Sequence, residues 1–126
     1  HFFVLHVSVS EADQQWLSQY NVSIMSDKIN DFGDTAAIID HMDMVISIDT
    51  SVVHLAGAMA KPTINILPYV SDWRWQKSRE DSPWYPTMRL CKQAWKDNWE
   101  ETIERVIPIV KKATKQWERA EPISVF

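Results

Sequence analysis

The sequence predicts an α/β fold, a Rossmann-like and mainly parallel sheet flanked by helices. Strand-like and helix-like segments alternate in the order β-α-β-α-β-α-β-loop-β-α, which is typical of parallel strands joined by right-handed crossovers. Residues 44–48 and 63–67 are apolar almost without interruption, as parallel strands buried on both faces are. The 126 residues are enough for one hydrophobic core.

The N-terminal segment predicts a strand, a helix and a second strand. Residues 2–9 are rich in strand-forming side chains. Ser10 begins an N-cap pattern, so a helix is expected over 11–19 with Trp16 facing inward. A short strand is expected at 22–25.

A second helix is expected to follow a polar loop. Asp34 or Thr35 would cap it, because both side chains accept hydrogen bonds from a first helical turn. Ala37 and Ile38, together with His41 or Met42, would form its packing face. The apolar strand over 44–48 comes next.

A helix of small residues is predicted over 51–59. Small residues such as Ala56 and Gly57 let it lie close to the sheet, and Pro62 prevents it from continuing into the strand over 63–67. Beyond Pro68 the apolar residues recur with neither the helix nor the strand period, so residues 69–87 are predicted to form a long ordered loop. Loops of this length are usually functional.

The loop is expected to contain a helical turn at 72–77 and to lead into an edge strand at 88–91. Trp73, Trp75, Trp84 and Trp95 fall close together here. We expect them to supply core area, with a ligand-facing role for one or two as the alternative.

The last predicted element is an amphipathic helix after Asp97. Its apolar face is expected to comprise Trp99, Ile103, Val106, Ile107 and Val110. Pro108 is expected to kink or break it. The predicted domain covers residues 1–112, and residues 113–126 are the helix end and a tail that packs elsewhere or frays.

Composition excludes several classes of partner. A net charge of −4 without a clustered basic face disfavours nucleic acid. Cys91 is the single cysteine, so no disulfide and no metal site is expected, which fits a cytoplasmic protein. No apolar run is long enough for a transmembrane segment. Because the chain lacks a starting Met, we expect it to be a piece of a longer protein.

Polar residues gather where the strand over 44–48 meets the next helix. Asp49 ends the strand, Thr50 and Ser51 suit the helix N-terminus, and His54 falls in its first turn. Ligands bind outside the carboxyl ends of strands in open α/β sheets, and a helix N-terminus suits phosphate. The sequence therefore predicts a polyanion site, although Asp49 and Thr50 alone fit a capping pair and His54 alone a cap or core histidine.

The loop supplies a second group of candidates. Arg74 and Arg79 would neutralise a diphosphate, and Asp72 or Asp81 would hold sugar hydroxyls. The alternative is a surface loop tied together by its own salt bridges.

The corner motif resembles a known family. Residues 49–62 are similar to the D-[ST]-x-x-x-H-L-A-x-A-x-x-x-P signature of the ADP-heptose:lipopolysaccharide heptosyltransferases, glycosyltransferase family 9. Segments 31–45, 72–75 and 81–86 resemble a bacterial subgroup in which such a domain follows tetratricopeptide repeats.

The resemblance implies two Rossmann-like halves, the GT-B arrangement, of which this chain looks like the C-terminal half. It implies that Asp49, Thr50, Ser51 and His54 contact the diphosphate and sugar of a nucleotide-sugar donor, without a cofactor. The acceptor-activating carboxylate would lie in the missing N-terminal half, so the catalytic residue is unknown and the isolated chain is expected to be inactive. Ser51 departs from the family, which usually has Gly there.

Two other functions remain open from the sequence. The chain could be a non-catalytic interaction domain derived from a transferase half, in a tetratricopeptide-repeat protein. It could also be another phosphate-binding α/β domain, flavodoxin-like or epimerase-like. The second is disfavoured because the chain has only two glycines and no glycine-rich phosphate loop.

Overall fold

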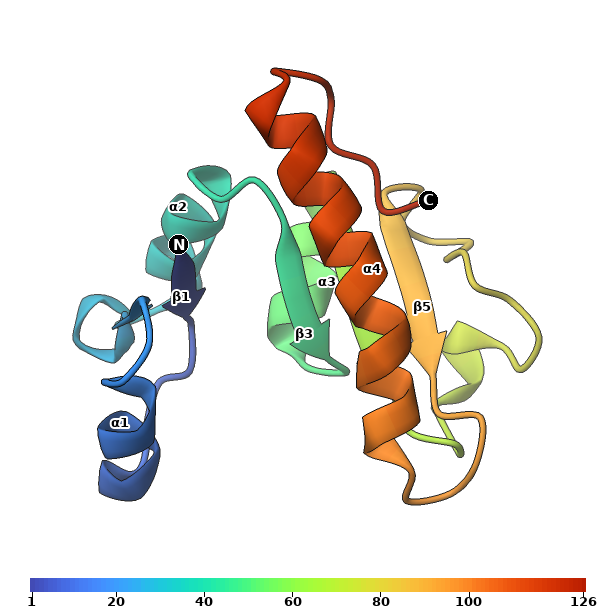
Figure 1. The fold of residues 1–126 in the computed structure, drawn as a ribbon, viewed down its shortest axis with the longest axis horizontal. Helices are drawn as coiled ribbons and strands as arrows, with labels where there is room; N and C mark the ends of the chain where they lie inside the picture. The colour runs from blue at the N-terminus through green and yellow to red at the C-terminus, as the bar shows by residue number, and fades with distance from the viewer. The chain divides into compact units, whose positions relative to one another are not determined.

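The computed structural model describes residues 1–126 and has the predicted α/β class (Figure 1). Every strand pair is parallel, and helices connect or cover the strands, which confirms the Rossmann-like fold class. The chain divides into two compact units, residues 1–38 and 39–126. Each unit is described by itself below.

The first unit contains a pair of parallel strands. β1 (Phe2–Val4) and β2 (Val22–Ile24) are joined through α1 (Glu11–Leu17), in the predicted order. The Ser10 hydroxyl accepts a hydrogen bond from the Asp13 amide at 3.1 Å, so the predicted N-cap is confirmed.

Two details of the first unit differ from prediction. Trp16 is exposed and contacts the ring of Tyr20 at a centroid distance of 4.9 Å, so its inward orientation was wrong. Helix α1 has no buried residue, so the large indole ring finds no core to enter on this helix. The loop after β2 contains a 3-10 turn, η1 (Ser26–Lys28).

Helix α2 (Phe32–Asp40) begins earlier than predicted. The carboxylate of Asp31, and not the side chain of Asp34 or Thr35, accepts from a first-turn amide: the Asp34 N–H lies 3.0 Å away. The buried positions are Thr35 and Ile39, four residues apart on one helix face, whereas Ala37 of the predicted face is exposed and Ile38 is half-buried.

The second unit is built on a three-stranded parallel sheet. Its strands are β3 (Val45–Ile48), β4 (Thr63–Leu67) and β5 (Met88–Lys92), with β4 in the centre. β4 is buried along its whole length, as predicted. β3 is not, because it is an edge strand of this sheet, and Ile48 is 58% exposed.

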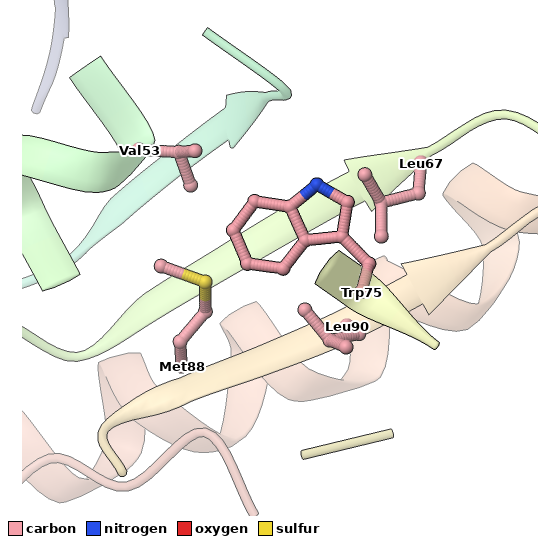
Figure 2. Packing of buried hydrophobic residues seen from close by; sticks show 5 residues of the cluster. All are labelled: Val53, Leu67, Trp75, Met88 and Leu90. Carbon is pink, nitrogen blue, oxygen red and sulfur yellow. The ribbon is translucent and has the colours of Figure 1, made fainter. Parts of the chain in front are cut away.

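Side chains of one sheet face pack against α3 (Ser51–Ala58) and the loop before β5. The cluster there comprises Val53, Leu67, Trp75, Met88 and Leu90, with the half-buried Tyr85 against it (Figure 2). Helix α3 ends at the predicted place, where Ala60 adopts a left-handed conformation with φ 55°. This face of the sheet is the one that positions the candidate site.

The opposite face is covered by α4 (Trp99–Glu118), which crosses in front of the sheet in Figure 1. The cluster there comprises Ile64, Ile66, Cys91, Val106 and Val125. The helix continues through Pro108, so the predicted break was wrong. No helix of the chain is both long and apolar enough to cross a membrane.

The buried stripe of α4 is displaced from the predicted one. Thr102, Val106 and Ala113 are buried, whereas Trp99 and Ile103 of the predicted face are exposed. Thr102 and Val106 lie one turn apart on one helix face, and Ala113 follows two turns later on the same face. The chain end packs instead of fraying, since Val125 is buried in the cluster on this face.

Candidate functional site

The structure brings the four corner residues together at the carboxyl end of β3. Asp49 follows the strand, Thr50 is the N-cap residue of α3 in extended conformation, and Ser51 and His54 lie in the first turn. The Thr50 side chain does not cap the helix, and its Oγ1 lies 3.3 Å from Ser47 Oγ instead. The N-terminus of α3 therefore has no side-chain cap, which leaves its amide donors available to an anion.

The carboxylate of Asp49 is held by a tryptophan from the loop. Trp75 Nε1 donates to Asp49 Oδ2 at 2.8 Å, and His54 Nε2 lies 3.6 Å from Asp49 Oδ1. The Asp49 side chain remains 26% exposed. Since a carboxylate can accept about four hydrogen bonds, Asp49 can still accept from a ligand.

The imidazole of His54 is held by two aromatic side chains. Its Nδ1 lies 3.0 Å from the Tyr85 hydroxyl. Its ring stacks on Trp75, with centroids 5.2 Å apart and planes inclined by 23°. A third of the His54 side chain is exposed, so the ring is fixed in orientation but open to a ligand.

Gly57 explains how Tyr85 reaches the corner. A Cβ atom at position 57 would lie 2.5 Å from Tyr85 Cγ and 2.9 Å from Met88 Cε, which is closer than such atoms approach. The bare backbone of α3 therefore makes room for the Tyr85 ring. Gly57 lies one turn beyond His54, so the same helix supplies both the space and the hydrogen-bond partner.

Lys92 ties the loop to the end of β5. Its Nζ donates to the carbonyl of Trp75 at 2.7 Å and also to that of Gln76, with the Arg79 carbonyl 3.5 Å away. Burial lowers the pKa of the Lys92 ammonium. The backbone at Trp75 and immediately after it is thereby anchored from a strand of the sheet.

The four charged loop residues pair with one another. Asp72 caps the 3-10 turn η2 (Trp73–Trp75): its Oδ1 accepts from the Arg74 amide at 3.0 Å and lies 3.4 Å from Arg74 Nε. Arg79 pairs with Asp81, and its hydrogen bonds hold the pKa of that carboxyl below its usual range. Their contact with a donor remains a prediction, because each of them has a partner within the loop.

Of the four clustered tryptophans, Trp75 alone supplies core area. Trp75 is fully buried, whereas Trp73 is 76% exposed and Trp84 and Trp95 are exposed as well. The expectation that all four fill the core was therefore wrong for three of them. Their spacing contains no signal that distinguishes Trp75, since only the fold decides which indole reaches Asp49.

Sequence reasoning did not place Trp75, Tyr85 and Lys92 at the candidate site, where the structure gives them contacts. The one available signal was the length and aromatic content of the loop, which indicated function without naming a residue. No group of three His, Cys, Asp or Glu side chains is placed to hold a metal ion. Cys91 is buried, and burial raises the pKa of its thiol.

A family model for glycosyltransferase family 9 (heptosyltransferase) matches residues 30–98, more than half of the chain. The chain belongs to glycosyltransferase family 9. The matched part of this family 9 domain contains the whole β3–α3 corner together with Trp75, Tyr85 and Lys92.

One curated relative of the family 9 domain is Protein FlbA of Caulobacter vibrioides. The two are 36% identical over 76 residues, which are 60% of this chain and 12% of that protein. The chain thus spans about an eighth of the relative's length. No solved structure matches the chain.

Proposed function

We propose that this family 9 domain binds the nucleotide-diphosphate sugar donor of a glycosyltransferase at the β3–α3 corner. The observation behind the proposal is that Asp49 and His54 are fixed beside the uncapped N-terminus of α3. The corner thus combines an anion-binding helix end with a carboxylate acceptor and an imidazole. A diphosphate joined to a sugar needs both kinds of partner.

The two ends of the donor would have different partners. The diphosphate is expected at the first turn of α3, where the amides, the Thr50 and Ser51 hydroxyls and the helix dipole favour negative charge. The Asp49 carboxylate repels phosphate and suits sugar hydroxyls, which donate. His54 Nε2 lies 3.6 Å from Asp49 Oδ1, beyond a good hydrogen bond, so it is free to bond an oxygen of the nucleotide sugar.

The chemistry follows from this arrangement. Transfer with inversion is what the family resemblance implies. As the glycosidic bond breaks, negative charge grows on the departing diphosphate, and the helix N-terminus stabilises it. The proposal requires neither metal nor cofactor. Ser51 replaces the usual Gly, so its Cβ limits how closely the backbone approaches a phosphate.

The remaining expectations concern the whole protein. We propose that this chain is the C-terminal half of a GT-B enzyme, with the acceptor base in the other half. The resemblance of segments 72–75 and 81–86 supports placing it in a bacterial, cytoplasmic protein beside tetratricopeptide repeats. The sequence that precedes this chain in its parent protein tests that placement, because such repeats recur every 34 residues or so.

Calorimetric titration of the intact protein tests donor binding. UDP, GDP and ADP are compared, each alone and as its glucose conjugate, with Asp49→Asn, His54→Ala and the control Asp43→Asn. We expect His54→Ala to lower the affinity for both the free nucleotide and its glucose conjugate. Asp49→Asn should lower the affinity for the glucose conjugate roughly 10-fold and that for the free nucleotide much less, because the Asp49 carboxylate is proposed to bind the sugar.

The control Asp43→Asn makes the same charge change at the opposite end of β3 and should leave affinity unchanged. If no nucleotide binds the intact protein with a Kd below about 1 mM, the proposal fails. A non-catalytic interaction domain would then be the better description.

A further inference from the structure

We propose that Tyr85 and Trp75 are positioning residues. They determine which ring nitrogen of His54 carries the proton, how that ring is oriented, and which rotamer Asp49 adopts. This inference rests on the proposed function, because the two fixed groups are the ones proposed to hold the donor. Neither Tyr85 nor Trp75 needs to touch the donor. Each acts through a side chain of the β3–α3 corner.

The groups that face the two ring nitrogens favour one tautomer of neutral His54. A carboxylate oxygen can only accept, so the proton belongs on Nε2, which faces Asp49 Oδ1 at 3.6 Å. Nδ1 is then an acceptor, and the Tyr85 hydroxyl donates to it at 3.0 Å. At 3.6 Å the contact with Asp49 is too long for a good hydrogen bond, so the Nε2–H stays available to an oxygen of an anionic ligand.

Trp75 supplies the second constraint. Its indole N–H donates to Asp49 Oδ2 at 2.8 Å, while its ring stacks on the imidazole. The indole is fully buried among side chains of β4 and β5, and Figure 2 shows it between Leu67 and Met88. Because such packing leaves a ring little freedom, one oxygen of Asp49 is held and the other faces His54.

The position of Tyr85 is fixed independently of its hydroxyl. Its ring occupies the space left by Gly57, and its amide donates to the Ser82 hydroxyl at 3.2 Å. Removing the hydroxyl alone should therefore leave the ring in place. Tyr85→Phe thus separates the hydrogen bond to His54 from the packing of the loop.

The test compares Tyr85→Phe with the wild type and with Tyr69→Phe, a matched change at an exposed tyrosine of the same loop. The nitrogen chemical shifts of the neutral His54 ring report which nitrogen is protonated and whether Nδ1 accepts a hydrogen bond. Calorimetry of the intact protein then measures affinity for whichever UDP-, GDP- or ADP-glucose the wild type binds.

We expect the wild-type ring to be protonated on Nε2 and Tyr85→Phe to shift the Nδ1 resonance. Donor affinity should fall roughly 5- to 10-fold, the loss of one neutral hydrogen bond, while Tyr69→Phe changes neither quantity. A wild-type proton on Nδ1, or ring shifts unaffected by Tyr85→Phe, would overturn the inference. Shifted resonances with unchanged affinity would also overturn it, because the contact would then serve structure alone.

The two proposals fail in different ways. If the wild type binds none of the nucleotides, the proposed function is wrong, whatever the His54 ring reports. If the wild type binds a nucleotide sugar and Tyr85→Phe binds it equally well, only the positioning role is wrong. A urea titration of each variant shows that it is folded before its affinity is compared.

Discussion

At the residue scale, one glycine links the helix of the corner to the loop. Gly57 faces the Tyr85 ring so closely that no side chain fits between them. Tyr85 in turn contacts His54 through its hydroxyl and through an edge-to-face ring contact at 5.8 Å. The hydrogen bond of His54 to Tyr85 therefore depends on the absence of a Cβ atom at position 57.

Gly57→Ala should destabilise the protein. The added Cβ would overlap the Tyr85 ring and the Met88 methyl group, and overpacking of this kind costs about 1–3 kcal/mol of unfolding free energy. That cost exceeds the gain of up to about 1 kcal/mol that alanine brings to a helix interior. A lower urea midpoint is the expected measurement.

The exposed neighbour Ala58→Ser serves as the control, with an expected change within about 0.5 kcal/mol. A stability of Gly57→Ala equal to or above that of the wild type would show that Tyr85 can move away without cost. The close contact would then not be the reason for glycine at this position.

At the element scale, a loop takes the place of a crossover helix. Between β4 and β5 the chain forms only the short turn η2, yet Trp75 and Tyr85 from this segment fill the sheet face beside α3. Residues of the same loop also cover the outer edge of β5, where the Leu90 amide donates to the Glu80 carbonyl at 2.6 Å. The loop is therefore part of the core and part of the site at once.

Lys92→Met should loosen this loop. The variant keeps the apolar stem of the side chain and removes the ammonium that donates to the Trp75 and Gln76 carbonyls. Hydrogen bonds from a charged group contribute about 1.5–3 kcal/mol, so local opening should become roughly 10- to 100-fold more frequent. Limited trypsin digestion should detect this as faster cleavage after Arg74, Lys77 and Arg79.

Lys96→Met removes an exposed lysine a few residues further on and should leave the cleavage rate unchanged. Equal loop cleavage in Lys92→Met and the wild type would mean that Trp75 packing alone anchors the segment. The lysine would then have no part in ordering the loop.

At the scale of the whole molecule, the hydrophobic core is distributed unevenly. Both clusters of buried apolar side chains lie within residues 39–126. Within residues 1–38 Thr35 is the one buried side chain, and β1 and β2 pair over only three residues each. The β3–α3 corner and the loop between β4 and β5 therefore belong to the better-packed unit.

Amide hydrogen exchange should reveal this difference. Amides of β4, such as those of Asn65 and Ile66, should exchange orders of magnitude more slowly than those of Phe3 and Ser23, because protection follows the free energy of local opening. Exchange measured residue by residue under native conditions makes the comparison. Equal protection in the two units would show that they open as one cooperative body.

The sequence by itself determined the fold class, the order of the elements and the place where four corner residues meet. Those features depend on local patterns: apolar runs, caps such as Ser10, and the strand–helix junction at Asp49. The family signature lies in the same contiguous segment, which is why it was visible without a structure.

The tertiary structure alone decided which loop residues contact Asp49 and His54. Trp75 lies 26 residues from Asp49 and Tyr85 lies 31 residues from His54, so no periodicity links them. It also decided that β3 is an edge strand with Ile48 exposed, and that α4 packs through Thr102 and Val106. Burial depends on which elements become neighbours, and contacts between distant segments leave no local pattern in a single chain.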